Sequence, residues 1–208
     1  MPRKARPQIA LRDFSWSRAP KDNYRLWNDA GVQRVARSGG AAETYKPLEG
    51  HENPLGQFTS IESPQEVLEF VRKFGPVTDE GMDTSKGENV QNALQQARLM
   101  GKVLRAAKNE QYPLDISWEP TPISLAIKLG ESGSEEPFLK VGPRTLLDAI
   151  WLQLAEVIAG DGEIRHCRYC GLWFAAGGQS GRRQDAKFCS DEHRIAFNND
   201  QRRTAGRG

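Results

Sequence analysis

The chain has 208 residues, of which 38% are hydrophobic and 27% are charged. That length fits one domain of ordinary size with a small module appended to it. No stretch approaches the ~20 consecutive apolar residues that span a bilayer, and the basic N-terminus has no apolar run behind it. We therefore expect neither a membrane segment nor a signal peptide.

The formal net charge of +2 is distributed unevenly. Counting Lys and Arg against Asp and Glu, residues 1–37 carry +6, residues 38–164 carry −9, and residues 165–208 carry +5. Basic ends are one feature of chains that bind nucleic acid or another polyanion, although basic termini also simply stay solvated. The charge pattern leaves both interpretations open.

Residues 1–60 show little hydrophobic periodicity, and glycine, proline and charge are scattered through them. We expect an irregular, basic N-terminal arm over this range. The arm contains too many aromatic residues for a free linker, namely Phe14, Trp16, Tyr24 and Trp27. It should therefore pack against the rest of the protein in places.

A first helix is predicted to begin at Ser63. Ser63 and Glu66 have the spacing of a capping box, and Pro64 suits the first helical position. Apolar residues then supply one face, and Gly75-Pro76 ends the helix.

Two longer helices follow. Residues 88–108 place apolar side chains at three- and four-residue steps, with Gln, Arg and Lys on the opposite face. The most apolar helix is expected to open at Gly142-Pro143 and to stop at Gly160. Its wide apolar stripe, which includes Trp151, should be buried against the helix at 88–108.

Between these helices the hydrophobic period changes to two. Residues 122–128 alternate apolar and polar side chains, and residues 138–141 are the expected partner strand of a hairpin. The fold class is therefore α+β: a mainly helical domain over residues 61–160 with one small hairpin, and a separate module over residues 161–208.

The three cysteines all lie within 23 residues of one another, in the C-terminal module. Such clustering indicates metal binding rather than disulfides and a reducing, cytoplasmic setting. Cys167 and Cys170 can share a tight turn. Cys189 and His193 are four residues apart at an expected helix start, where Ser190 can act as the cap.

Three thiolates and one imidazole complete a tetrahedral zinc site with no open position for a catalytic water. We therefore predict one structural Zn²⁺ ion, held by Cys167, Cys170, Cys189 and His193. His166 adjoins Cys167 and is the alternative fourth ligand. His193 is preferred because adjacent residues of a tight turn rarely both face one metal.

The order of elements around these residues is typical of a treble-clef finger. Gly171 to Phe174 fits a strand that leaves the first turn, and Lys187-Phe188 fits a return strand before the last helix. Trp173 and Phe174 are interpreted as the small core of the finger, with base stacking as the alternative.

This module resembles the CGNR-type zinc fingers and related treble clefs of bacterial proteins. The matching positions are Cys167, Cys170, Gly171, Phe174, Arg182, Arg183, Phe188, Cys189 and Ser190. Two departures make it a cousin rather than a member: His193 replaces the last cysteine, and Arg194-Ile-Ala replaces Gly-Asn-Arg. The resemblance implies a bacterial source and a presumed role as a transcription regulator that binds DNA.

The helix after His193 offers a candidate DNA-binding surface. Arg and Asn side chains of such a helix can read base edges, and neighbouring cations can neutralise phosphates. The predicted contacts are Arg182, Arg183, Lys187, Arg194, Asn198, Arg202 and Arg203.

Two other classes of function compete with DNA binding. The acidic domain could bind a protein partner, with the finger as a rigid scaffold stabilised by zinc. An enzyme is the least favoured, because the sequence offers no cluster of carboxylates beyond isolated residues such as Glu66, Glu69 and Asp148.

Overall fold

The structure is a computed structural model that describes residues 14–48, 54–108, 125–129, 139–159, 163–177 and 182–205. Strands and short helices dominate its first part: β1 Trp16–Arg18, η2 Lys21–Asn23, β2 Tyr24–Asp29, β3 Val32–Arg37, β4 Glu43–Tyr45, α1 Pro54–Phe58, α2 Pro64–Phe74, α3 Asp79–Met82 and β5 Glu88–Asn89. Longer helices and two hairpins follow: α4 Val90–Lys108, β6 Leu125–Leu129, β7 Leu139–Pro143, α5 Leu146–Ala159, β8 Glu163–His166, β9 Trp173–Ala176 and α6 Asp191–Ala205.

The strands pair in four small antiparallel sheets. β1 pairs with β4, β6 with β7, and β8 with β9, while the fourth sheet has the order β2-β3-β5. The described fold is thus mixed α and β, as predicted. The hairpin expected across residues 122–141 is confirmed in β6 and β7, where Ile127 lies opposite Val141.

Helix α2 begins and ends where its sequence signals predict. The Ser63 side chain accepts a hydrogen bond from the backbone N–H of Glu66, and the Glu66 carboxylate accepts one from the backbone N–H of Ser63. Gly75 ends the helix with φ of 81°, a left-handed conformation that favours glycine. All the buried side chains of α2 are apolar and lie on one face.

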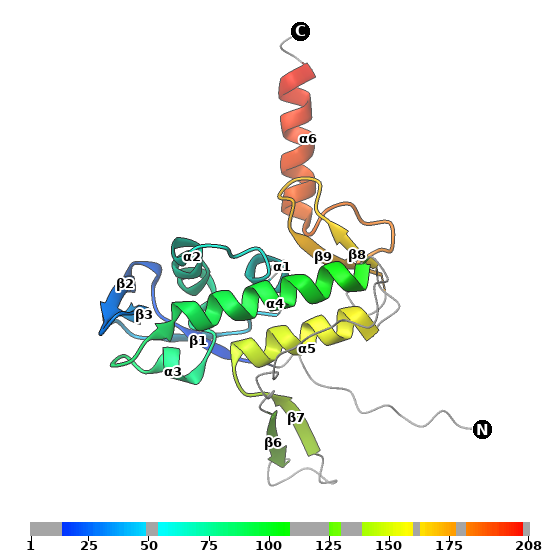
Figure 1. The fold of residues 1–208 in the computed structure, drawn as a ribbon. Coiled ribbons are helices and arrows are strands. Elements are labelled where there is room, and N and C mark those ends of the chain that lie inside the picture. The colour runs from blue at the N-terminus through cyan, green and yellow to red at the C-terminus, as the bar shows by residue number, and fades with distance from the viewer. Residues whose placement is uncertain are drawn as a thin grey trace, which may run out of the picture.

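Helices α4 and α5 pack together and supply much of the core, as predicted (Figure 1). The indole N–H of Trp151 on α5 donates to the side-chain oxygen of Gln96 on α4 at 3.1 Å, which gives a largely buried polar group a partner. One boundary differs from the prediction. Gly142 and Pro143 belong to the end of β7, and α5 begins at Leu146, with Thr145 and Asp148 exchanging capping hydrogen bonds.

The prediction of an irregular N-terminal arm is wrong for residues 16–45, which form β1 to β4. Phe14, Trp16 and Tyr24 are buried in the same core as the long helices. The indole N–H of Trp16 donates to the backbone oxygen of Pro76 at 2.7 Å. These aromatic side chains therefore anchor the segment in the core and to the loop after α2, whereas the prediction had only occasional packing contacts.

The last part of the chain stands apart from this core. We call residues 163–177 and 182–205 the finger, and the other described residues the body. Figure 1 shows α6 rising away from the body, with β8 and β9 between the two. No residue of α6 is buried.

Candidate metal centre

The first two cysteines occupy the turn between β8 and β9. The backbone N–H of Cys167 donates to Leu172 at 2.9 Å, and the N–H of Gly171 donates back to Cys167 at 2.9 Å. Gly171 has φ of 74°, so a residue without a Cβ suits this position. This tight turn lets both sulfurs point to one side.

The second pair lies where α6 begins. The Ser190 hydroxyl accepts a hydrogen bond from the N–H of His193 at 3.1 Å, as predicted for the helix cap. The predicted return strand at Lys187-Phe188 is not present. Instead the N–H of Arg168 donates to the backbone oxygen of Lys187 at 3.0 Å, which holds the returning chain beside the first turn, and β9 pairs with β8.

The four predicted ligand residues come together. The three sulfurs and one nitrogen that Cys167, Cys170, Cys189 and His193 offer all lie within 4.8 Å of one another. We call these four residues the metal cluster. The structure thus shows a Cys₃His group that could hold one metal ion.

The spacing of the ligand atoms can be compared with a tetrahedral zinc site. Usual zinc–ligand distances give edges of about 3.8 Å between two sulfurs and about 3.6 Å between a sulfur and a nitrogen. Cys170 Sγ lies 3.7 Å from Cys189 Sγ, and Cys167 Sγ lies 3.7 Å from His193 Nδ1. A third edge, between Cys189 Sγ and His193 Nδ1, is shorter at 2.9 Å, and the remaining three lie within 4.8 Å. The donor set fits zinc, with Nδ1 as the ligating nitrogen.

The surroundings of the three sulfurs differ. Burial tends to raise the pKa of the Cys167 thiol, but backbone N–H groups of Cys170, Cys189 and Tyr169 outweigh burial and lower that pKa to about 6. Burial raises the pKa of both Cys170 and Cys189, and at Cys189 the neighbouring sulfurs raise it further. A thiolate at Cys167 alone is favoured by the protein, whereas the other two thiolates need a cation to stabilise them.

His166, the alternative ligand, is engaged elsewhere. Its Nδ1 lies 2.8 Å from the backbone oxygen of Gly171, and its ring lies against that of Trp173 with centroids 3.5 Å apart. The geometry therefore brings His193, and not His166, to the three cysteines.

The two aromatic residues of β9 face opposite ways. Phe174 is buried with Cys167, Ala176 and Cys189 in the small core of the finger, as predicted. Trp173 instead packs against the core of the body, with the Lys108 ammonium 4.9 Å from its ring centroid. Sequence reasoning missed this docking role, although the alternation of side chains along a strand is its signal.

The predicted nucleic-acid residues lie on the finger, and several of their charges are already paired. Arg183 pairs with Asp185 at 3.0 Å, Arg194 with Asp191 at 3.2 Å, and Arg203 with Asp200 at 3.9 Å. The remaining members are the exposed Lys187, Asn198 and Arg202, and the half-buried Arg182.

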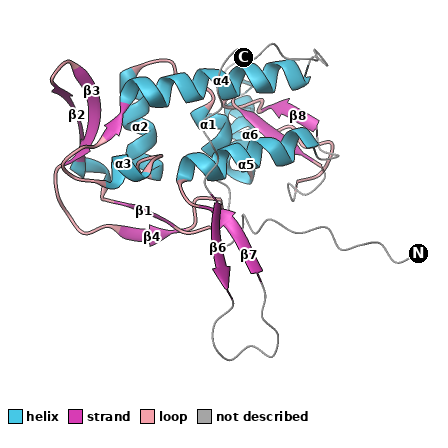
Figure 2. Ribbon diagram, turned by 60° about the horizontal axis from the view of Figure 1, so that its bottom comes forward, coloured by secondary structure: helices cyan, strands magenta, loops and turns pink. Residues whose placement is uncertain are grey.

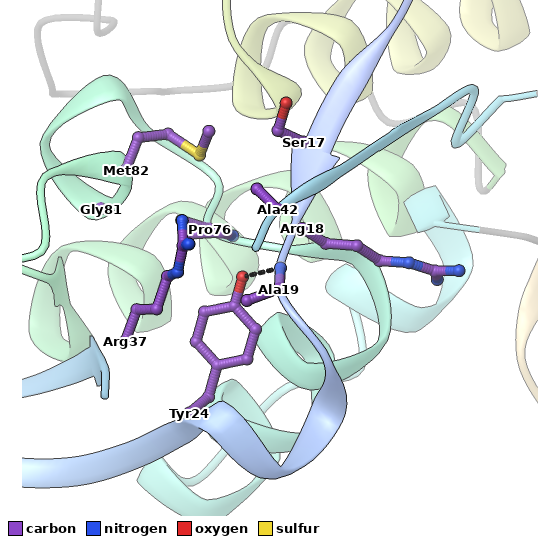
Figure 3. A pocket seen from close by; sticks show the side chains of 9 residues that line it. All are labelled: Ser17, Arg18, Ala19, Tyr24, Arg37, Ala42, Pro76, Gly81 and Met82. Carbon is purple, nitrogen blue, oxygen red and sulfur yellow. Dashed lines mark hydrogen bonds between the residues drawn. The ribbon is translucent and has the colours of Figure 1, made fainter. Parts of the chain in front are cut away.

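A small hollow lies in the body, far from the metal cluster in the chain (Figure 3). Tyr24 and Arg37 reach into it, and the buried Tyr24 hydroxyl accepts a hydrogen bond from the N–H of Ala19 at 2.8 Å. Its cavity volume is only about 10 Å³. Sites for drug-sized ligands are usually about 300–1,000 Å³, so this hollow is too small to serve as one.

No family model matches the chain, and the searches of curated proteins and of solved structures gave no match either. Among the helices that the structure describes, none combines the length and the apolar character needed to cross a bilayer. The metal cluster is therefore the feature from which a function is best argued.

Proposed function

We propose that the chain binds one structural zinc ion through Cys167, Cys170, Cys189 and His193, and that the finger binds DNA as part of a transcription-regulator-like protein. The observation that carries the proposal is the convergence of three sulfurs and one imidazole nitrogen within 4.8 Å. Four protein ligands complete the tetrahedral coordination of a zinc ion, so the metal would stabilise the fold rather than activate a water molecule. Because thiols stay available for zinc in a reducing setting, we propose a cytoplasmic location.

The exposure of α6 supports the second half of this proposal. α6 has 15 residues, none of them buried, and it projects from the body in Figure 1. A helix of that length extends for about 22 Å and is of the size that enters a major groove. Arg194, Asn198 and Arg202 lie at four-residue steps along it, and these residue types recognise base edges.

The likeness to bacterial CGNR-type fingers adds to this proposal. It covers the Cys167 and Cys170 turn, the glycine after it, and the aromatic-Cys-Ser run that ends at Ser190. We propose that the finger is a treble-clef relative in which the last ligand has become His193.

A protein-binding role is the second candidate, because apolar side chains are exposed around the metal cluster. Tyr169 is 45% exposed and Ile195 is 52% exposed. Under this alternative the zinc-stabilised finger presents these side chains to a protein partner, and the acidic part of the body adds charge recognition.

The two candidates differ in how binding should respond to salt. We would measure binding of the zinc-loaded protein to random duplex DNA over a salt series, with a finger variant in which Arg182, Arg183, Arg194 and Arg202 are Ala. A matched control changes four exposed body cations to Ala: Lys21, Arg25, Lys86 and Arg144.

The DNA proposal predicts affinity that falls steeply with salt and is lost in the finger variant but not in the control. Absence of binding by the unaltered protein at low salt would contradict it and leave the protein-binding candidate.

A further inference from the structure

Helix α4 presents an exposed polar face with positive charge only. α4 contains four basic residues and no acidic residue. Its exposed side chains recur at three- and four-residue steps and so form one stripe along the helix. The members of this α4 stripe are Gln91, Gln95, Arg98, Lys102 and Arg105.

Among the described residues, the cations of the α4 stripe have no salt-bridge partner, unlike Arg194 and Arg203 of α6. These cations are Arg98, Lys102 and Arg105, whereas Arg194 and Arg203 each pair with an aspartate. The net charge of −9 between residues 38 and 164 therefore does not describe this face. Such a row of cations attracts a polyanion.

We propose that the α4 stripe binds the phosphate backbone of the same nucleic-acid duplex that the finger contacts. Arg98 and Lys102 are about 6 Å apart along the helix axis, and Arg98 and Arg105 about 10 Å apart. Phosphates of one DNA strand follow at about 3.4 Å along its axis, so the three cations extend over about three successive phosphates. The Gln amides of the stripe can donate hydrogen bonds to phosphate oxygens, which position the duplex without reading its sequence.

The helix that carries the stripe ends beside the finger. The C-terminal end of α4 lies beside β8 and β9 in Figure 1, and α4 runs along one edge of the body in Figure 2. Lys108, the last residue of α4, contacts the ring of Trp173 on β9. The finger is thus docked at the end of the helix that carries the stripe, and our proposal is that one duplex contacts both. This inference rests on the proposed DNA binding by the finger.

The test compares two variants of the full-length, zinc-loaded protein that each remove one exposed arginine and one exposed lysine. The stripe variant is Arg98→Gln with Lys102→Gln, and the control is Lys21→Gln with Arg25→Gln. Arg105 stays, because its guanidinium lies close to Gly101 on the same helix. Binding to random duplex DNA is measured over a salt series, and thermal melting shows that both variants are folded.

The proposal predicts that the stripe variant binds at least ~10-fold more weakly near 0.1 M salt, and that the slope of log K against log salt becomes shallower by about two. The control should match the unaltered protein. If the stripe variant also matches it while the finger variant loses binding, the stripe proposal is overturned and DNA binding by the finger stands. If the unaltered protein does not bind DNA, both proposals fail.

Discussion

The buried side chains of the body and of the finger differ in number and in kind. The described part of the body buries aromatic and aliphatic side chains from strands β1, β2 and β3 and from helices α1, α2, α4 and α5, including Phe58, Phe74 and Leu104. The buried hydrophobic side chains of the finger are Cys167, Phe174, Ala176 and Cys189, the helix cap Ser190 is buried beside them, and no residue of α6 is buried. Hydrophobic burial can therefore hold the body together, whereas the finger needs another source of stability, which the proposed zinc ion supplies.

The largest expected effect comes from removing the metal. Chelating zinc near pH 7 should unfold the finger and melt the 15 residues of α6, because structural zinc binding contributes roughly 10 kcal/mol in isolated fingers. Circular dichroism should show the loss of this helix while the thermal transition of the body persists. Adding zinc back should restore the helical circular-dichroism signal. If chelation left hydrogen exchange in α6 unchanged, the finger would not depend on zinc for its stability.

A substitution in the core of the body should destabilise the body and leave the finger unaffected. Phe74 is 1% exposed, and Phe74→Ala should lower the free energy of unfolding of the body by about 3–5 kcal/mol, with zinc content unchanged. Phe174→Ala in the finger is the matched control, and it should weaken zinc binding while the body melts as before. Equal destabilisation of both regions by either change would show that they fold as one unit.

The pH dependence of the body should reflect a buried carboxyl group. Burial raises the pKa of Glu88 to about 7, although its carboxylate accepts hydrogen bonds from the N–H groups of Val77 and Thr78. The folded protein therefore retains a proton that the unfolded chain loses near pH 4.5. This contribution to the free energy of unfolding is complete below pH 4.5 and disappears as the pH rises through 7, a change of roughly 3 kcal/mol.

The measurement is urea unfolding between pH 4.5 and 8 of the unaltered protein, Glu88→Gln and the exposed control Glu69→Gln. Only Glu88→Gln should remove this part of the pH dependence. The stability difference between this variant and the unaltered protein should shift in favour of the variant as the pH rises. A difference that stays constant with pH would show that Glu88 is ionised in the folded body.

The smallest expected effects come from the same substitution at two helix caps. Ser63→Ala removes the cap of α2 and should lower the free energy of unfolding of the body by about 1 kcal/mol. Ser190→Ala removes the cap of α6 and should weaken zinc binding about fivefold, with the body unaffected. Urea unfolding measures the stability of the body, and competition with a chromophoric chelator measures the zinc affinity. A loss of body stability in Ser190→Ala would contradict the view that the body and the finger are stabilised independently.

Local sequence signals predicted the parts of the fold that depend on nearby residues. Residues close in the chain form the Ser63 capping box and the apolar period of residues 88–108. The four metal-binding candidates were found because clustered cysteine and histidine residues commonly bind zinc. The β2–β3 hairpin was also open to local prediction, because Asp29 and Val32 pair across the two-residue turn Ala30-Gly31, and both turn residues have positive φ.

Strands β1, β4 and β5 could not be predicted in this way. Trp16 pairs with Tyr45, and Arg34 with Asn89, so their signals lie in contacts between short segments far apart in sequence.

In the finger too, the contacts between segments were harder to predict than the local spacing of residues. The cysteine and histidine spacing identified the metal cluster, but β8, with the sequence Glu-Ile-Arg-His, is too short to show a period. Its pairing with β9 took the place of the predicted return strand at Lys187-Phe188. Alternation along β9 places Trp173 on the face opposite Phe174, but the partner that Trp173 meets on the body is set by a tertiary contact that spacing alone does not give.

The central claim, that His193 and the three cysteines hold one zinc ion, is tested most directly by the zinc content of the purified full-length protein and of two histidine variants. Native mass spectrometry should find one zinc ion in the unaltered protein and in His166→Ala, and reduced zinc occupancy in His193→Ala. Full zinc occupancy in His193→Ala together with loss of zinc from His166→Ala would contradict the account and make His166 the fourth ligand.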